Sequence, residues 1–175
     1  HLGGYGVAYG DKLGGLINVK TRAPNSEKME QSLQLGTYES AYRIEGPISK
    51  QNSGYFAIRR SYIDLLLPKT GTLGGNDLAY TQFPQFWDMH AKWRHQKNNE
   101  FIEFNLINSN DEFTLDVNKD GDILKDPALA GELGGTEGFT TYALRWEKEI
   151  DPSLRHKTRV GLLLSLIHIS EPTRQ

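Results

Sequence analysis

The stretch DVNKDGDILKD, which begins at residue 116, has the residue types and spacing of a calcium-binding loop. Asp116, Asn118, Asp120 and Asp122 bring oxygen ligands at alternate positions, and the glycine after Asp120 permits the sharp turn that such loops need. Proline follows the stretch where a bidentate glutamate would complete the ligand set, so the predicted affinity is weak. The alternative is a polar Asp-Gly turn that binds no metal. Ca²⁺ in this loop is the one cofactor that the sequence suggests.

A second group of ionisable and polar side chains alternates with apolar ones along 86–95, 100–108 and 140–150. A period of two places each set on its own face of a strand. In a soluble sheet the apolar face, which holds all three tryptophans, would cover a core. In an outer-membrane barrel it would meet lipid, and the polar face would line a wet interior. The predicted polar wall of such a barrel consists of Asp88, His90, Lys92, Arg94, Glu103, Asn105, Arg145 and Glu147.

Composition excludes several classes of protein and site. The net charge of −2 comes without a basic patch, which argues against a nucleic-acid partner. Cysteine is absent, so disulfides and thiolate metal sites are excluded. No run of 18 apolar residues predicts a transmembrane helix. Neither a G-x-S-x-G nucleophile motif nor an H-E-x-x-H zinc motif occurs, and we expect no enzymatic activity.

The elements that must position these side chains are six or seven strands between residues 29 and 163. Short polar turns at 50–53, 97–99 and 151–153 alternate with connections of twenty or more residues, predicted over 63–83 and 109–138. Long connections are unusual in compact soluble domains, whereas outer-membrane barrels pair short turns with long extracellular loops. The sequence therefore predicts an all-β, antiparallel up-and-down meander.

The segment YGDKLGGLINVKTR (9–22) resembles the end of the plug domain of TonB-dependent outer-membrane receptors. The segments LGTYESAYRIEGPIS and YFAIRRSYIDLLL that follow are similar to the first barrel strands of that family. The resemblance covers about residues 1–163, and its specific motifs lie in 5–65. The residues proposed as the plug-end motif are Tyr9, Gly10, Asp11, Gly14, Gly15 and Asn18.

The resemblance implies a domain organisation. Residues 1–22 would end a plug domain, 23–28 would be a linker, and 29–163 would be the first strands of an incomplete transmembrane β-barrel. Residues 164–174 resemble a translated sequencing adapter, so 164–175 are expected to be an artefact and the chain to be a fragment.

The resemblance also implies a function, which is energised uptake of a scarce nutrient across the outer membrane of a Gram-negative bacterium. The ligand would be an iron chelate, a vitamin, a glycan or a peptide, and the two long connections would contact it. The partners would be outer-membrane lipid and the TonB energy-transducing complex, the latter reached through a missing N-terminal part.

Two other functions are compatible with the alternating pattern. The first is a secreted, soluble β-sandwich that binds carbohydrate and carries a structural calcium; its tryptophan face would be buried. The second is an outer-membrane barrel enzyme, which would need a serine or aspartate beside a positioned histidine.

Overall fold

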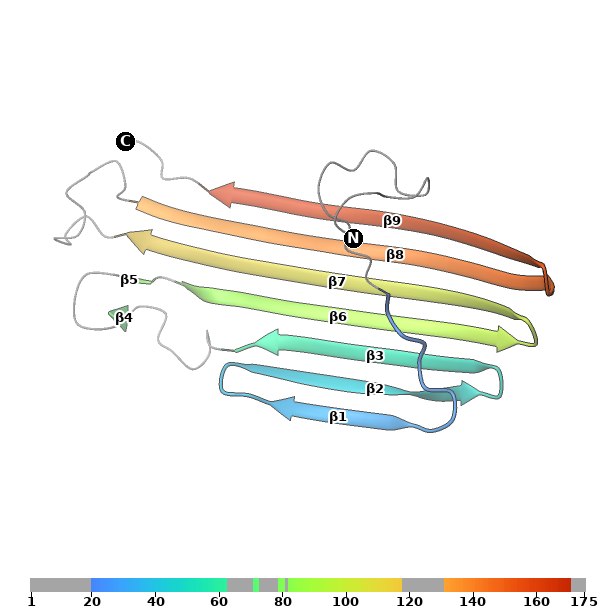
Figure 1. Ribbon diagram of the computed structural model, residues 1–175. Helices are drawn as coiled ribbons and strands as arrows, with labels where there is room; N and C mark the ends of the chain where they lie inside the picture. Colours follow the sequence, from blue (N-terminus) through green and yellow to red (C-terminus); the bar gives the residue numbers. More distant parts are fainter. Residues whose placement is uncertain (1–19, 63–70, 73–78, 81, 118–130, 171–175) are drawn as a thin grey trace, which may run out of the picture.

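The computed structural model describes residues 20–62, 71–72, 79–80, 82–117 and 131–170. These residues are all-β, and most of them form one seven-stranded antiparallel sheet (Figure 1). A separate two-stranded sheet pairs β4 (Gly71–Thr72) with β5 (Ala79–Tyr80). The strands of the large sheet are β1 (Glu30–Leu35), β2 (Glu39–Ser49), β3 (Asn52–Ser61), β6 (Gln82–Lys97), β7 (Glu100–Val117), β8 (Gly131–Asp151) and β9 (Leu154–Ser170).

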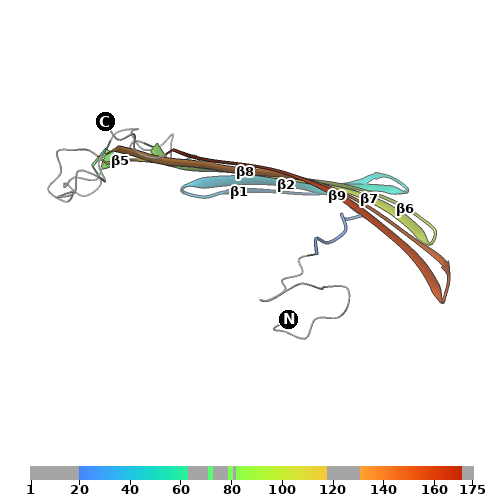
Figure 2. The same cartoon turned by 90° about the horizontal axis from the view of Figure 1, so that it is seen from above.

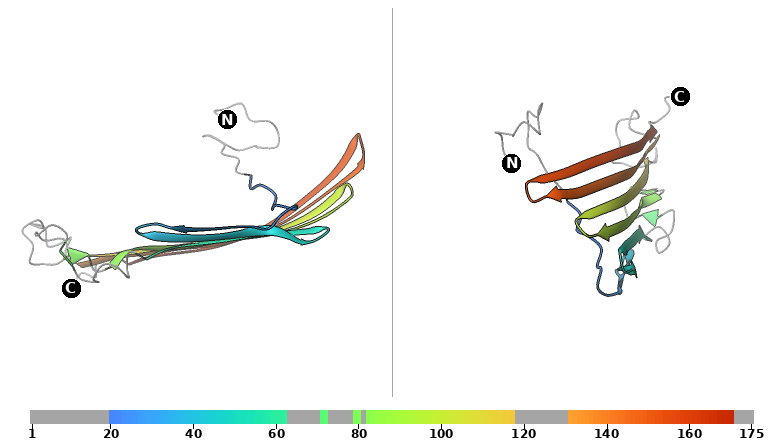
Figure 3. Two further views of the ribbon diagram at one scale, coloured as in Figure 1. Left: turned by 90° about the horizontal axis from the view of Figure 1, so that it is seen from below. Right: turned by 90° about the vertical axis from the view of Figure 1, so that its right-hand side faces the viewer.

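The large sheet is an up-and-down meander, because its spatial order β1-β2-β3-β6-β7-β8-β9 follows the order along the chain. The predicted fold class is confirmed to this extent. The sheet is not closed on itself, and β1 and β9 form its two edges. Seen edge-on it is a single layer that bends toward one end, and the segment before β1 lies on one side of it (Figures 2 and 3).

Three tight hairpins lie where the sequence predicts short turns. The turns connect Ser49 to Asn52, Lys97 to Glu100, and Asp151 to Leu154. Asn98 adopts a φ of 50° in the second turn. Asparagine tolerates this left-handed conformation better than most residues, so Asn98 suits a turn of only two residues.

The long connection predicted over 109–138 was wrong in its extent. β7 continues to Val117 and β8 already begins at Gly131, and these two residues pair with each other. The connection is therefore 118–130. The strand predicted over 100–108 ended where the polar run 108–111 interrupts the alternation, but a ladder is held by backbone hydrogen bonds, which continue through polar and glycine-rich sequence. Similarly, β4, β5 and the first residues of β6 occupy part of the connection predicted over 63–83.

β9 includes residues 164–170, although the sequence predicts that they derive from an adapter. Their backbone pairs in register with residues 134–140 of β8. The fold of the described chain thus extends beyond residue 163. The origin of this segment and the predicted domain boundaries stay predictions.

The side chains that the sheet buries are polar or charged. No hydrophobic side chain forms a buried core among the described residues, whereas twenty-three large hydrophobic residues are exposed, Trp93 and Leu144 among them. The register places most of these residues on the face opposite the buried charges, and that face is far larger than the isolated apolar residues that soluble surfaces carry. The buried polar residues are Glu45, Ser53, Ser61, Lys92, Glu103 and Glu147.

Candidate functional site on the polar face

The register of the sheet determines which side chains share a face. Arg94 pairs with Glu103, which pairs in turn with Arg145, so these three residues lie in one row across β6, β7 and β8. Positions two residues apart on each strand join the same face. All the residues of the predicted wall lie on this face, called the polar face below: Asp88, His90, Lys92, Arg94, Glu103, Asn105, Arg145 and Glu147. That the polar face lines a barrel interior stays a prediction.

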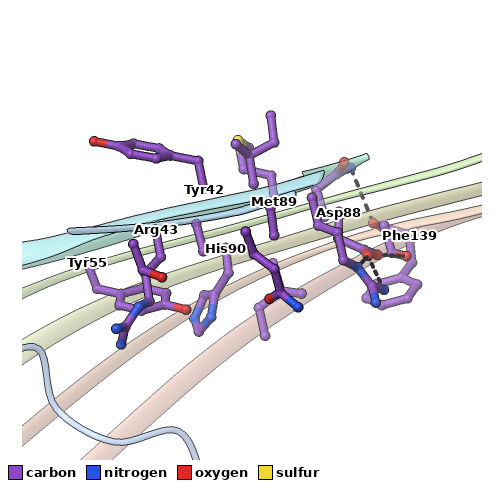
Figure 4. Close-up of a pocket in the computed structure, with 16 residues that line it drawn as sticks. Tyr42, Arg43, Tyr55, Asp88, Met89, His90 and Phe139 are labelled. Atoms are coloured by element: carbon purple, nitrogen blue, oxygen red, sulfur yellow. Dashed lines mark hydrogen bonds and ion pairs between the residues drawn. The ribbon is translucent and has the colours of Figure 1, made fainter. Parts of the chain in front are cut away.

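The alternation is visible at a hollow of about 380 Å³ near the middle of the sheet (Figure 4). Tyr42 and Met89 project from one side, whereas Arg43, Tyr55 and His90 project from the other. The imidazole of His90 lies edge-on to the Tyr55 ring with centroids 4.9 Å apart. Its Nε2 lies 2.7 Å from the side-chain oxygen of Asn105. These contacts place His90 in the wall as a hydrogen-bonded residue.

Asp88 links three strands on the polar face. The Nε of Arg59 on β3 donates to Asp88 Oδ2 at 2.8 Å, and the hydroxyl of Ser109 on β7 donates to Asp88 Oδ1 at 2.6 Å. The Arg59 guanidinium also lies 4.8 Å from the centroid of the Phe86 ring. Both carboxylate oxygens are therefore satisfied, and Asp88 is a structural partner of Arg59 in this arrangement.

Three buried carboxylates on the polar face each contact two basic side chains. Glu103 lies 3.7 Å from Lys92 and 3.4 Å from Arg94. Glu147 accepts a hydrogen bond of 2.7 Å from Arg145 and lies 3.7 Å from Arg159. The third carboxylate, Glu45, contacts Arg22 and Arg43. This two-to-one arrangement gives the middle of the polar face an excess of positive charge.

Glu45 and Lys92 hold the segment before β1 against the polar face. Nη1 of Arg22 donates to Glu45 Oε2 at 2.6 Å, and the backbone N–H of Asn25 donates to the same oxygen at 3.1 Å. The Lys92 ammonium donates to the hydroxyl of Thr21 and, at 2.8 Å, to the carbonyl oxygen of Arg22. We call these five residues the linker clasp. Figure 1 shows the segment passing in front of β2, β3 and β6.

The two sheet residues of the linker clasp are the most deeply enclosed charges of the polar face. The side chain of Glu45 is 0% exposed and that of Lys92 is 1% exposed. A buried charge is tolerated only when it is paired and hydrogen-bonded. Removing the segment would take from Glu45 one of its two guanidinium partners and from Lys92 two of its acceptors. The segment is thus part of the electrostatic structure of the sheet.

The linker clasp was not predicted from the sequence. Lys92 was predicted as a wall residue and Arg22 was matched only within the resemblance, whereas Glu45 and Arg43 were not singled out. The alternating charges in YRIE place Arg43 and Glu45 on one face, which was a usable signal. The contact of Glu45 with Arg22 depends on the path of the linker, which no sequence pattern specifies.

Two predicted groups lie outside the described residues. The plug-end motif falls wholly within 1–19, and Asn118, Asp120 and Asp122 fall within 118–130. Asp116 belongs to β7, where its backbone pairs with Glu132. Within the described ranges, no group of three or more histidine, aspartate or glutamate side chains is placed to hold a metal ion. The calcium site stays a prediction.

Comparison with known proteins gives this chain no relative: no protein-family model, no curated protein and no solved structure matches it. Among the described residues, no helix is both long and apolar enough to cross a membrane.

Proposed function

We propose that this chain is part of a TonB-dependent outer-membrane receptor that takes up a scarce nutrient. The observation that carries the proposal is the two-sided sheet, which buries ion pairs on one face and exposes most of its large aromatic and aliphatic side chains on the other. Lipid is the environment that stabilises such an apolar face without a second protein layer. The family is proposed from the resemblance of residues 5–65 to plug-end and first barrel segments.

The exposed face has the composition expected of a lipid-facing surface. Trp87, Trp93 and Trp146 are each between one third and one half exposed, and aliphatic and aromatic residues lie among them on the same face. The indole nitrogen of Trp146 on β8 donates at 2.7 Å to Glu100, the first residue of β7. An amphipathic ring with a satisfied polar edge is typical of a membrane interface.

Quenching of tryptophan fluorescence by brominated lipid tests the lipid contact. The 175-residue chain would be refolded into vesicles of phosphatidylcholine that carries bromine on its acyl chains, with unbrominated vesicles as the reference. Direct contact is expected to quench most of the emission, because all three tryptophans lie on the apolar face. A chain that stays soluble without detergent and shows no quenching would refute the proposal and favour the carbohydrate-binding β-sandwich.

Uptake is tested in the source organism. Deletion of the gene should impair growth on one limiting nutrient in a panel of iron chelates, vitamins, glycans and peptides. A protonophore should reduce uptake of the same nutrient in the parent strain, since the proposed transport is energised. Unchanged growth and uptake across the panel would contradict the transport function while leaving the lipid contact intact.

A further inference from the structure

A second hollow, of about 440 Å³, lies on the polar face where the segment before β1 faces β8 and β9. Ala143 and Gly161 pair with each other across these strands and leave room between larger neighbours. Four basic residues surround that space: Lys20 from the segment, Arg145 from β8, and Lys157 and Arg159 from β9. The hollow therefore has small residues beside a basic rim.

The positive charge around this hollow is only partly compensated. Glu147 contacts both Arg145 and Arg159, at 2.7 Å and 3.7 Å. Glu103 also lines the hollow, but it is already shared by Lys92 and Arg94. In the part of the chain that the structure describes, no carboxylate forms an ion pair with Lys20 or Lys157.

The basic side chains remain accessible to a solute. Arg145 is 37% exposed and Arg159 is 64% exposed, and both guanidinium groups have more donors than Glu147 can satisfy. Planar guanidinium groups are suited to paired hydrogen bonds with carboxylate or phosphate oxygens. An oxyanion with at least two negative charges would match this arrangement.

We propose that the hollow is a binding site for a small, multiply charged oxyanion of the phosphate class. Arg145, Arg159 and Lys157 provide the sheet side of the site and Lys20 provides the segment side. The linker clasp holds Thr21 and Arg22 in place and so positions Lys20 beside the sheet. The anion bridges the segment to β8 and β9. Anion binding and docking of the segment are therefore linked, and each strengthens the other.

This site does not depend on the transport proposal, because it needs only the polar face and the docked segment. A titration in maltoside micelles, which contain no phosphate, tests it on the whole 175-residue chain. The probe is inorganic phosphate, compared with sodium chloride at equal ionic strength to separate binding from screening. The readout is the chemical shift of the Ala143 and Gly161 amides. A saturable shift with phosphate and a weak, unsaturated one with chloride are expected.

Matched variants on β9 test the residues. Arg159→Gln and Lys157→Gln should each weaken phosphate binding at least about 10-fold, the size of effect that loss of one charge-assisted hydrogen bond produces. Arg155→Gln is the control, since Arg155 lies on the same strand and face but pairs with Glu149 at 3.1 Å. It should change the affinity less than about 2-fold, whereas a non-specific charge effect gives the same loss for all three variants.

Hydrogen exchange at the Asn25 amide tests the linkage to the segment. Saturating phosphate should slow this exchange several-fold in the original chain, and Lys20→Gln should abolish that slowing. The inference is overturned if no shift at Ala143 and Gly161 saturates, or if Arg155→Gln weakens binding as much as Arg159→Gln. It is also overturned if phosphate binds but leaves exchange at Asn25 unchanged, because the anion then does not bridge the segment to the sheet.

Discussion

Glu45 supplies the carboxylate that binds the segment before β1 to the sheet, alongside the ammonium group of Lys92. We expect Glu45→Gln to weaken docking of the segment by about 1–3 kcal/mol, because a neutral amide replaces the acceptor of Arg22 and leaves Arg43 without its ion pair. The estimate is below that for a fully buried pair since Arg22 itself is 58% exposed. Faster hydrogen exchange at the Asn25 amide measures the effect.

Glu39→Gln is the matched control for this substitution. Glu39 lies on the same strand and face as Glu45, but its ion pair with Arg59 is 3.7 Å long and does not involve the segment. Exchange at Asn25 should be unchanged in this variant. Equal acceleration by both substitutions would mean that the segment responds to the overall charge of the face and not to the linker clasp.

The turn between β8 and β9 carries a pH-sensitive residue. The hydroxyl and the backbone N–H of Ser153 both donate to Asp151, at 2.6 Å and 2.7 Å, and they hold the pKa of that carboxyl below its usual range. A lowered pKa means that the ionised form stabilises the turn. This stabilisation is present above about pH 4, the ordinary pKa of aspartate, and is lost as the pH falls through the lower value in the folded chain.

Carboxyl chemical shifts across an acid titration measure the pKa of Asp151 directly. Ser153→Ala removes the hydroxyl donor and keeps the backbone donor, so the pKa should rise part of the way toward its ordinary value. An unchanged midpoint in Ser153→Ala would show that the hydroxyl bond is not formed in solution.

Within β8, neighbouring positions face different environments. If the apolar face meets lipid, Leu144→Lys should lower the free energy of unfolding in lipid vesicles by about 2–4 kcal/mol, the cost of a basic residue near the middle of a bilayer. Thr141 lies three residues before Leu144 on the polar face, and Thr141→Lys should cost less than about 1 kcal/mol. Urea titration followed by tryptophan fluorescence compares them. Equal losses would contradict a lipid-facing surface.

The strands themselves were the most predictable feature of the chain. Alternation in FWDMHAKWRH correctly assigned the two faces of β6, because a period of two is a direct consequence of backbone geometry. The end of β7 and the start of β8 were missed, because the polar run 108–111 interrupts the alternation in β7 and glycines interrupt it in β8, whereas backbone pairs such as Asn110 with Gly138 continue the ladder. Loss of alternation marks the end of a face and need not mark the end of a strand.

The candidate site was only half predictable, for a different reason. Wall residues follow from alternation within a strand, so Lys92 and Glu103 could be placed on one face. The linker clasp joins Arg22 to Glu45 across more than twenty positions, and Lys20 and Arg159 line one hollow although they are much further apart in the sequence. Both arrangements depend on strand register and on the path of the linker, which local sequence does not encode.

For the molecule as a whole, the open edges of the sheet are the main unsatisfied feature. β9 pairs with β8 on one side only, and β1 pairs with β2 on one side only, within the described residues. The outer edge of β9, a strand of 17 residues, offers a row of backbone donors and acceptors to another strand. In lipid such groups are costly when unpaired, so a lipid-facing sheet demands a further strand at each edge.

The 175-residue chain, purified alone in detergent, should therefore associate with itself along these edges. The chain has no cysteine, so single cysteines report contacts without interference. Thr158→Cys and Leu162→Cys on β9 should form disulfide-linked dimers under mild oxidation, with one position reacting much more than the other according to the register of the paired edges. Asn105→Cys on the central strand β7 is the control and should remain reduced. A monomer by light scattering, or cross-linking as efficient at position 105 as on β9, would show that something other than strand pairing covers the edges.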